Sequence, residues 1–200
     1  MNISKAFADA EQLKSKIPAE YIGKLTGLSS PKIWHLLNNL AGQADSYFEI
    51  GTHMGSTLMA AMYGNSVSAT AVDNFCMKPK TRGHFFHNVK DMKFTFIEQD
   101  CFTIAPEKIG PFDLYFYDGE HSYESQYKAI SHFLPSMKKE FVYIVDDWNN
   151  ECVRAGTFDA IQANDLEAIE MEDRQNKLMK DTAGWWCGIA VFKLKKHVTN

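Results

Sequence analysis

The sequence predicts an α/β fold: one domain built on a doubly wound, mostly parallel sheet. From residue 44 onward, short apolar runs alternate with helical stretches. Continuous apolar runs are typical of strands that are buried on both faces of a parallel sheet. Near the end of the chain, two strand-like runs are joined by a connection too short for a crossover helix. We therefore expect seven strands with an antiparallel last strand, preceded by N-terminal helices.

The individual elements follow from local patterns along the chain. Residues 1–43 are expected to be helical, and Ser30 before Pro31 marks a helix start, because serine caps a first turn and proline fits its first position. The expected strands are 47–50, 67–72, 94–97, 112–117, 141–145, 166–171 and 185–194. Helical stretches such as 57–63 and 123–133 separate the earlier runs. The chain of 200 residues is thus one domain, with helices over 1–43 and an α/β core over 44–195.

Composition narrows the range of partners. Lys and Arg number 21 and Asp and Glu 25, so the formal net charge of -4 gives no basic surface for nucleic acid or an anionic membrane. A small-molecule substrate is expected instead. The four cysteines show no C-x-x-C spacing, which indicates free thiols in a reducing compartment. No apolar stretch reaches the ~18 residues of a membrane span. We expect a cytoplasmic protein, and a homo-oligomer is compatible with the sequence.

The first strand of the core runs into a glycine-containing turn. The turn includes Glu49, Gly51, Thr52, Gly55 and Ser56. Its two glycines let the backbone turn tightly and approach a ligand at the start of a helix that Ser56 or Thr57 can cap. The spacing is G-x-x-x-G, and His53 stands where the dinucleotide fingerprint G-x-G-x-x-G has its middle glycine. Taken alone, the segment is equally compatible with a tight turn that binds nothing.

Acidic residues follow the second and third strands. Asp73 lies 22 positions after Gly51, where a carboxylate can accept hydrogen bonds from both hydroxyls of a ribose. Asp100, next to Cys101, can accept from the amine of a base or can cap a short helix. Ligands of open α/β sheets bind beyond the carboxyl ends of the strands, so we expect these residues around one ligand.

A second acidic group follows the fourth and fifth strands. Asp118 lies in the segment YDGEHSY, and Asp146 and Asp147 come 28 and 29 positions later. Three carboxylates at adjacent strand ends repel one another unless a cation neutralises them, and hard oxygen ligands suit Mg²⁺ or another divalent cation. The structural alternative is a turn at Asp118 and helix capping by the other two.

Together, the turn, the two strand-end acids and the antiparallel finish resemble the class I methyltransferases that use S-adenosylmethionine (SAM). The resemblance covers residues 46–194 and implies a Rossmann-like fold with SAM as cofactor. It implies that the turn residues Glu49, Gly51 and Gly55 face the methionine part of the cofactor. Asp73 would hold the ribose, and Asp100 and Cys101 the adenine. The expected cofactor site is completed by Thr52, Ser56 and Asp118.

The D-G-x-H-x-Y segment with the later D-D pair resembles a branch that includes metal-dependent sugar O-methyltransferases. This resemblance implies that Asp118, Asp146 and Asp147 bind the metal, while His121 or Glu120 takes the proton of the acceptor. We favour His121 as base because an unperturbed histidine has a pKa near 6.5.

The predicted function is therefore SAM-dependent O-methyl transfer to a hydroxyl of a small or sugar-like substrate, with help from a divalent cation. The alternative is a non-catalytic nucleotide-binding or interaction domain that has a methyltransferase fold, because fold alone does not establish function. An NAD-dependent oxidoreductase fits less well, since the middle glycine is missing and the chain ends with an antiparallel strand.

Overall fold

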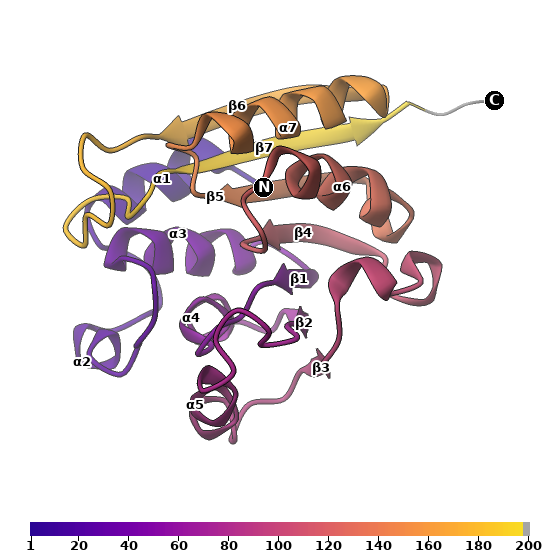
Figure 1. The fold of residues 1–200 in the computed structure, drawn as a ribbon. Helices are drawn as coiled ribbons and strands as arrows, with labels where there is room; N and C mark the ends of the chain where they lie inside the picture. The colour runs from indigo at the N-terminus through magenta and orange to yellow at the C-terminus, as the bar shows by residue number, and fades with distance from the viewer. Residues whose placement is uncertain (198–200) are drawn as a thin grey trace.

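The computed structural model describes residues 1–197 and contains one seven-stranded sheet in the order β3-β2-β1-β4-β5-β7-β6 (Figure 1). The strands are β1 (Ser46–Ile50), β2 (Ser68–Val72), β3 (Thr95–Ile97), β4 (Phe112–Tyr117), β5 (Met137–Asp146), β6 (Leu166–Arg174) and β7 (Ile189–Lys196). The first five strands pair in parallel, whereas β7 runs antiparallel to both β5 and β6. The predicted doubly wound, mostly parallel sheet is confirmed. The last three residues of the predicted domain, 198–200, lie outside the described residues.

Helices cover both faces of the sheet (Figure 1). They are α1 (Ile3–Glu11), α2 (Ala19–Ile22), α3 (Pro31–Ala41), α4 (Ser56–Met62), α5 (Thr81–Asn88), α6 (Tyr123–Phe133) and α7 (Glu151–Ala163). Three short 3₁₀ turns are η1 (Cys101–Thr103), η2 (Pro106–Lys108) and η3 (Leu134–Ser136). Helix α3 begins at Pro31, as the sequence predicts. Within residues 1–197, no helix has the length and apolar character needed to span a membrane.

The central strands divide their side chains between two apolar cores. Leu114 and Phe116 of β4 face the core beneath α1, α3 and α4, while Tyr115 faces the core beneath α6 and α7. This alternation follows from the two-residue period of a strand. Burying each large apolar side chain contributes about 1.5–3 kcal/mol. The carboxyl ends of the strands are therefore held on a rigid base.

The segment before β7 differs from the sequence expectation. The run 185–194 was expected as one strand, but β7 begins at Ile189. Trp186 instead exchanges two backbone hydrogen bonds with Asp181, at 3.1 and 3.0 Å. Gly188 then has a φ of +86°, which breaks the extended backbone before the strand. Residues 175–188, which we call the β6–β7 loop, consequently fold back before the last strand begins.

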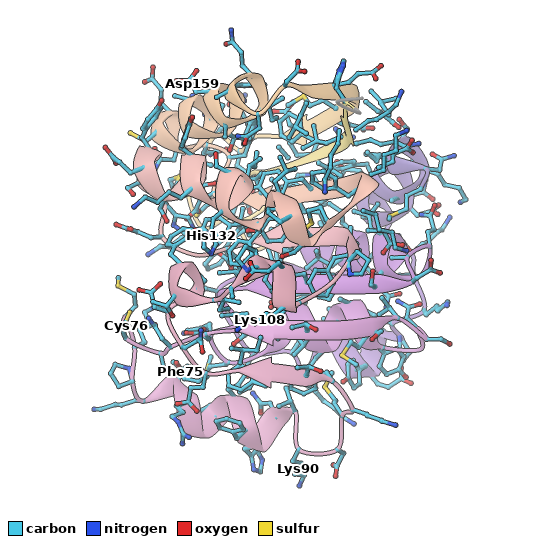
Figure 2. All side chains as sticks on the ribbon, turned by 90° about the vertical axis from the view of Figure 1, so that its right-hand side faces the viewer. Phe75, Cys76, Lys90, Lys108, His132 and Asp159 are labelled. Carbon is cyan, nitrogen blue, oxygen red and sulfur yellow. The ribbon has the colours of Figure 1, made fainter. Side chains whose placement is uncertain are left out.

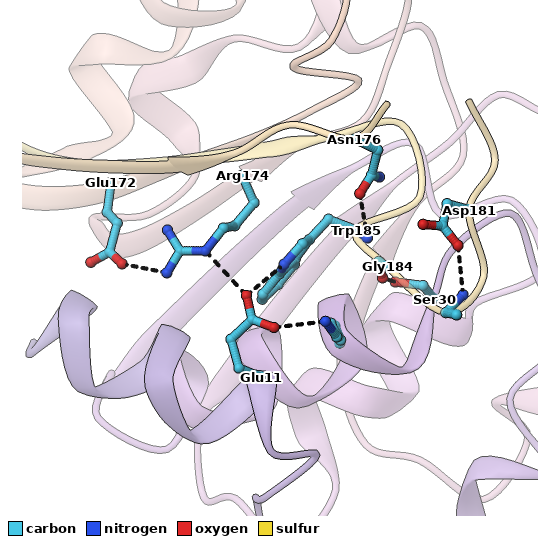
Figure 3. Close-up of polar contacts among 10 residues, drawn as sticks. Glu11, Ser30, Glu172, Arg174, Asn176, Asp181, Gly184 and Trp185 are labelled. Carbon is cyan, nitrogen blue, oxygen red and sulfur yellow. Dashed lines mark hydrogen bonds and ion pairs between the residues drawn. The ribbon is translucent and has the colours of Figure 1, made fainter. Parts of the chain in front are cut away.

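Glu11 at the end of α1 connects the β6–β7 loop to the N-terminal helices through hydrogen bonds and an ion pair (Figure 3). Its Oε1 accepts hydrogen bonds from the indole Nε1 of Trp185 at 2.9 Å and from Nε of Arg174 at 3.2 Å. Its Oε2 pairs with the ammonium group of Lys32 at 2.6 Å. Trp185 is 4% exposed, so its indole N–H depends on this carboxylate for a partner. One side chain thus joins segments from both ends of the chain.

Candidate active site

A cavity of about 620 Å³ opens at the carboxyl ends of the parallel strands β1 to β5. This is the position at which doubly wound sheets bind their ligands. Eleven of the predicted site residues line it: Gly51, Thr52, Ser56, Asp73, Asp100, Cys101, Asp118, Glu120, His121, Asp146 and Asp147. The fold therefore brings together both acidic groups that the sequence indicated.

The β1–α4 turn approaches the end of β4 closely. Gly51 has a φ of +88°, and a Cβ atom at this position would collide with the carbonyl oxygen of Asp118. The backbone N–H of Asp118 in turn donates to the carbonyl of Ile50 at 2.9 Å. Gly51 is needed here for two reasons, the left-handed backbone and the space. Gly55, with a φ of +87°, precedes α4 and is not among the cavity-lining residues.

Glu49 lies beneath the turn instead of facing a ligand. It is 0% exposed and is not among the residues that line the cavity, contrary to the expectation that it faces the cofactor. Tyr47 and Glu49 point to the same side of β1 because they are two residues apart. The Tyr47 hydroxyl donates to one carboxylate oxygen at 2.5 Å and the Thr57 hydroxyl to the other at 2.6 Å. Burial raises the pKa of Glu49 to about 8, although these two hydrogen bonds oppose the shift.

The carboxylate of Asp73 is held by two backbone N–H groups, one from the β1–α4 turn and one from the loop after β2. Its Oδ2 accepts the N–H of His53 at 2.8 Å, and its Oδ1 accepts the N–H of Phe75 at 2.7 Å. Oδ1 has a second lone pair with which it can accept a hydroxyl from the cavity, whereas Oδ2 also lies 3.4 Å from the hydroxyl of Thr52. Figure 2 marks the loop that follows Asp73 by its residues Phe75 and Cys76.

Asp100 caps a short helix and also lies in the cavity wall. Its Oδ1 accepts the N–H of Phe102 at 2.9 Å and so caps η1, while the residue also lines the cavity. Burial raises the pKa of the neighbouring Cys101 thiol to about 12, with a smaller contribution from the charge of Asp100. Cys101 therefore presents a neutral thiol to the cavity at neutral pH.

The imidazole of His121 lies between two of the predicted metal ligands. Its Nδ1 is 2.7 Å from Oδ2 of Asp147, and its Nε2 is 3.3 Å from Oδ1 of Asp118. Burial alone would lower the pKa of His121, but hydrogen bonds and charges from Asp118 and Asp147 outweigh burial and raise it to about 10. In this arrangement the two carboxylates favour the protonated form of the ring.

The neighbouring carboxyl groups respond to the same contacts. Asp146 is 4% exposed, and burial together with the charges of Asp118 and Asp147 raises its pKa well above the ordinary value. Burial also raises the pKa of Asp118. Burial acts to raise the pKa of Asp147 too, but the hydrogen bond and charge of His121, with smaller contributions from Cys187 and Lys180, together outweigh burial and lower the pKa. The positive charge of the His121 ring and the raised pKa of Asp146, which favours its neutral carboxyl form, therefore reduce the repulsion among the three acidic side chains.

The acidic cluster does not have the arrangement predicted for a divalent cation. Its carboxylates are hard oxygen donors, and Oδ1 of Asp146 is buried without a hydrogen-bond partner. Among residues 1–197, however, no three His, Cys, Asp or Glu side chains are grouped so that they could hold a metal ion. The imidazole of His121 lies between Asp118 and Asp147.

The β6–β7 loop supplies cavity residues that the sequence did not indicate. Lys180, Trp186 and Cys187 all line the cavity. The backbone N–H of Asn149, just after β5, donates to the carbonyl of Cys187 at 2.9 Å, which holds the loop against the strand end. The two adjacent tryptophans in the sequence were a partial indication of this loop's role. Trp185 enters the apolar core, whereas Trp186 lines the cavity.

Comparison with known proteins identifies the family. A model of the methyltransferase domain matches residues 48–148, which is half of the chain. This match runs from β1 to the residues just after β5 and includes every strand end that borders the cavity. A comparison with curated protein sequences finds no match.

Several solved structures share the fold at low sequence identity. The cofactor-bound protein Rv0187 from MTB is 17% identical with a TM-score of 0.63, and the match covers 98% of this chain and 90% of that one. The O-methyltransferase from Bacillus cereus in complex with SAH is 16% identical with a TM-score of 0.57, over 96% and 90% of the two chains. The O-methyltransferase TomG from Streptomyces achromogenes, involved in tomaymycin synthesis and in complex with SAM, is 16% identical with a TM-score of 0.55, over 98% and 89%. With this fold and a family model that spans half of its length, the chain belongs to the methyltransferase-domain family.

Proposed function

We propose that the protein transfers the methyl group of SAM to a hydroxyl oxygen of a small molecule. The observation that carries the proposal is one cavity lined by the glycine turn, the acid after β2, the acid after β3 and an acidic cluster after β4 and β5. SAM-dependent O-methyl transfer is also supported by two structural neighbours, the O-methyltransferase from Bacillus cereus and the O-methyltransferase TomG. A sugar-like acceptor, implied by the resemblance of the D-G-x-H-x-Y segment, belongs to the same proposal.

The cofactor would lie across the carboxyl ends of β1 and β2. Asp73 would accept hydrogen bonds from the ribose hydroxyls, and Asp100 from the adenine amine, while the thiol of Cys101 packs against the base. Gly51 would let the backbone approach the methionyl part. The positive sulfonium is favoured by the acidic lining of the cavity.

In the transfer step, the acceptor oxygen attacks the methyl carbon while the bond from carbon to sulfur breaks. The bonding electrons return to sulfur and leave S-adenosylhomocysteine (SAH), and the hydroxyl proton passes to a base. Both ring nitrogens of His121 face carboxylates, so His121 is not free to take that proton. Glu120 lines the cavity, and we assign it the proton, with His121 holding Asp118 and Asp147 in place. Positioning supplies most of the rate, since the methyl donor is already activated.

A divalent cation has no step in this mechanism. The sequence predicts one at Asp118, Asp146 and Asp147, but the placement of His121 among the described residues does not suit a shared metal ion.

The experiment has a binding and a transfer part. Calorimetry with SAH should show binding to the wild-type protein. Incubation with SAM carrying a labelled methyl group and a panel of sugars, phenols and alcohols should give a labelled product. Glu120→Gln should lose most of the transfer rate but keep its affinity for SAH. Saturable SAH binding without transfer to any acceptor would favour the non-catalytic alternative, and an active Glu120→Gln variant would remove Glu120 as base.

A further inference from the structure

The most exposed large apolar side chains among residues 1–197 lie in two loops. Met77 is 87% exposed, Leu178 73% and Met179 58%, whereas every other exposed side chain of this kind in the described part of the chain reaches at most 52%. Met77 belongs to the loop after β2, and Leu178 and Met179 belong to the β6–β7 loop. The two loops are about 100 positions apart in the sequence, so the fold alone decides whether they meet.

Both loops border the same cavity. Met77 of one loop and Lys180 of the other line it. Leu28, which is also exposed, lines the cavity from a third segment, and the hydroxyl of Ser30 beside it donates to the carbonyl of Gly184 in the β6–β7 loop at 2.8 Å. The exposed apolar side chains are therefore gathered where the cavity meets solvent, which we call the cavity mouth. Apolar groups gathered on an exposed surface mark a contact site for another molecule.

The same two loops are basic. Residues 74–82 and 175–180 contain no acidic residue but five basic ones: Lys78, Lys80, Arg82, Lys177 and Lys180. Arg82 pairs with Glu98 at 2.6 Å, whereas none of the four lysines forms an ion pair with a carboxylate of residues 1–197. All four lysines are exposed, while Asp100 and Glu120 are the exposed carboxylates among the described cavity-lining residues. The cavity mouth is thus positive, although the whole chain has a formal net charge of -4.

Apolar side chains flanked by unpaired lysines suit a lipid surface that carries negative charge. At such a surface the apolar groups insert at the boundary between headgroups and acyl chains, and the ammonium groups contact the phosphates. The methylene stems of the lysines remain in apolar surroundings. Nucleic acid also offers phosphates, but it would leave Met77 and Leu178 in water. Contact of this kind needs no helix that spans the bilayer.

We propose that the two loops dock the cavity mouth on an anionic lipid surface. Met77, Leu178 and Met179 insert into the surface, and the four lysines contact its headgroups. The cavity then opens toward the lipid, and a hydroxyl compound dissolved there enters without passing through water. This last consequence rests on the proposed function, whereas the docking does not depend on it.

Cosedimentation with vesicles measures the docking without SAM or a methyl acceptor. Vesicles of phosphatidylcholine alone are compared with vesicles of phosphatidylcholine mixed with anionic phosphatidylglycerol. The apolar variant is Met77→Ser/Leu178→Ser, and the charge variant is Lys78→Gln/Lys177→Gln. All four side chains are exposed, so both variants should keep the melting temperature of wild type.

Matched controls change side chains of the same kinds outside the two loops. Leu13→Ser/Ile169→Ser alters two exposed apolar side chains, and Lys90→Gln/Lys108→Gln alters two exposed lysines. Both controls should bind the mixed vesicles as wild type does. If they lose affinity as the loop variants do, the attraction belongs to the whole surface and the assignment to the cavity mouth is overturned.

Wild type should bind the mixed vesicles at least about tenfold more tightly than phosphatidylcholine alone. The charge variant should lose about 20-fold in affinity for the mixed vesicles, at about fivefold for each lysine. The apolar variant should lose about tenfold or more, because two inserted side chains are removed. Absence of binding to the mixed vesicles would overturn the proposal. Loss in the charge variant with no loss in the apolar variant would indicate attraction to any polyanion, such as RNA, and would overturn it too. Neither outcome affects the proposed methyl transfer, which calorimetry with SAH tests separately.

Discussion

Replacing the buried Glu49 by glutamine should change how the stability of the protein depends on pH. Burial raises the pKa of Glu49 from its ordinary value of 4.5 to about 8. Between these two values the folded state holds a proton that the unfolded state has released. The free energy of unfolding must therefore fall as pH rises through this window. The stabilisation is fully present below pH 4.5 and is lost above about pH 8.

The shift spans 3.5 pH units, and at about 1.4 kcal/mol per unit it corresponds to about 5 kcal/mol. Glutamine has nearly the same shape but does not titrate, so Glu49→Gln removes the pH-dependent contribution, while its amide group changes the hydrogen bonds with Tyr47 and Thr57 by an amount that does not depend on pH. Groups with shifted pKa values that do not interact with Glu49, such as His121, affect both proteins equally, whereas the charge of Asp118 acts on Glu49 and is part of the measured difference. The difference between the wild-type and variant free energies should therefore isolate Glu49.

Urea unfolding of both proteins from pH 5 to pH 8.5 measures this difference. Wild type should lose stability relative to Glu49→Gln steadily across the range. Glu140→Gln is the matched control, because Glu140 lies at the surface in an ion pair with Lys193 and its pKa is lowered by that partner. Its difference curve should be flat. If the Glu49 difference changes by less than about 1 kcal/mol, which is under one unit of pKa, the reasoning is refuted.

Three further outcomes are expected. Asp73→Asn should weaken SAH binding at least about tenfold in calorimetry, since a carboxylate is a stronger acceptor for the ribose hydroxyls of the proposed site than an amide. Equal affinities would remove Asp73 from the site. Mg²⁺ should leave the melting temperature of wild type unchanged in thermal-shift assays, and a rise that disappears in an Asp146→Asn/Asp147→Asn variant would show that a metal displaces the imidazole. Glu11→Ala should cost about 1–3 kcal/mol in urea unfolding because it leaves the indole N–H of Trp185 unpaired, whereas Glu11→Gln keeps an acceptor and should cost less; equal costs for the two variants would contradict this.

The sequence predicted the strands and their terminal acids because both are local properties. A continuous apolar run that ends in Asp73 or Asp146 places the acid at the carboxyl end of a buried strand, whichever partners the strand later finds. The spacing of two residues between Tyr47 and Glu49 also contained the information that they share a face. Applied to the turn, that rule would have placed Glu49 in the core below it and not in the cavity.

Other features of the site depend on contacts between distant segments. The D-G-x-H pattern gave no information on the backbone path that turns His121 toward Asp147, which is 26 residues away in sequence. The pKa of His121 follows from that contact, so its protonation could not be read from the motif. Likewise, Trp186 reaches the cavity because Asp181 and Gly188 shape the β6–β7 loop.

The place of β7 in the sheet also bears on how the protein forms during synthesis. Strand β6 is made before β7, yet β7 is its neighbour in the sheet and lies between it and β5. The parallel strands β1 to β5, with the turn and both acidic groups, can therefore assemble while the ribosome is still adding the C-terminal residues. The β6–β7 loop can form its side of the cavity only after β7 has inserted between β5 and β6 and Trp185 has bonded to Glu11. A nascent chain stopped before Ile189 would keep β5 as an open edge, which is a site for pairing with other unfinished chains.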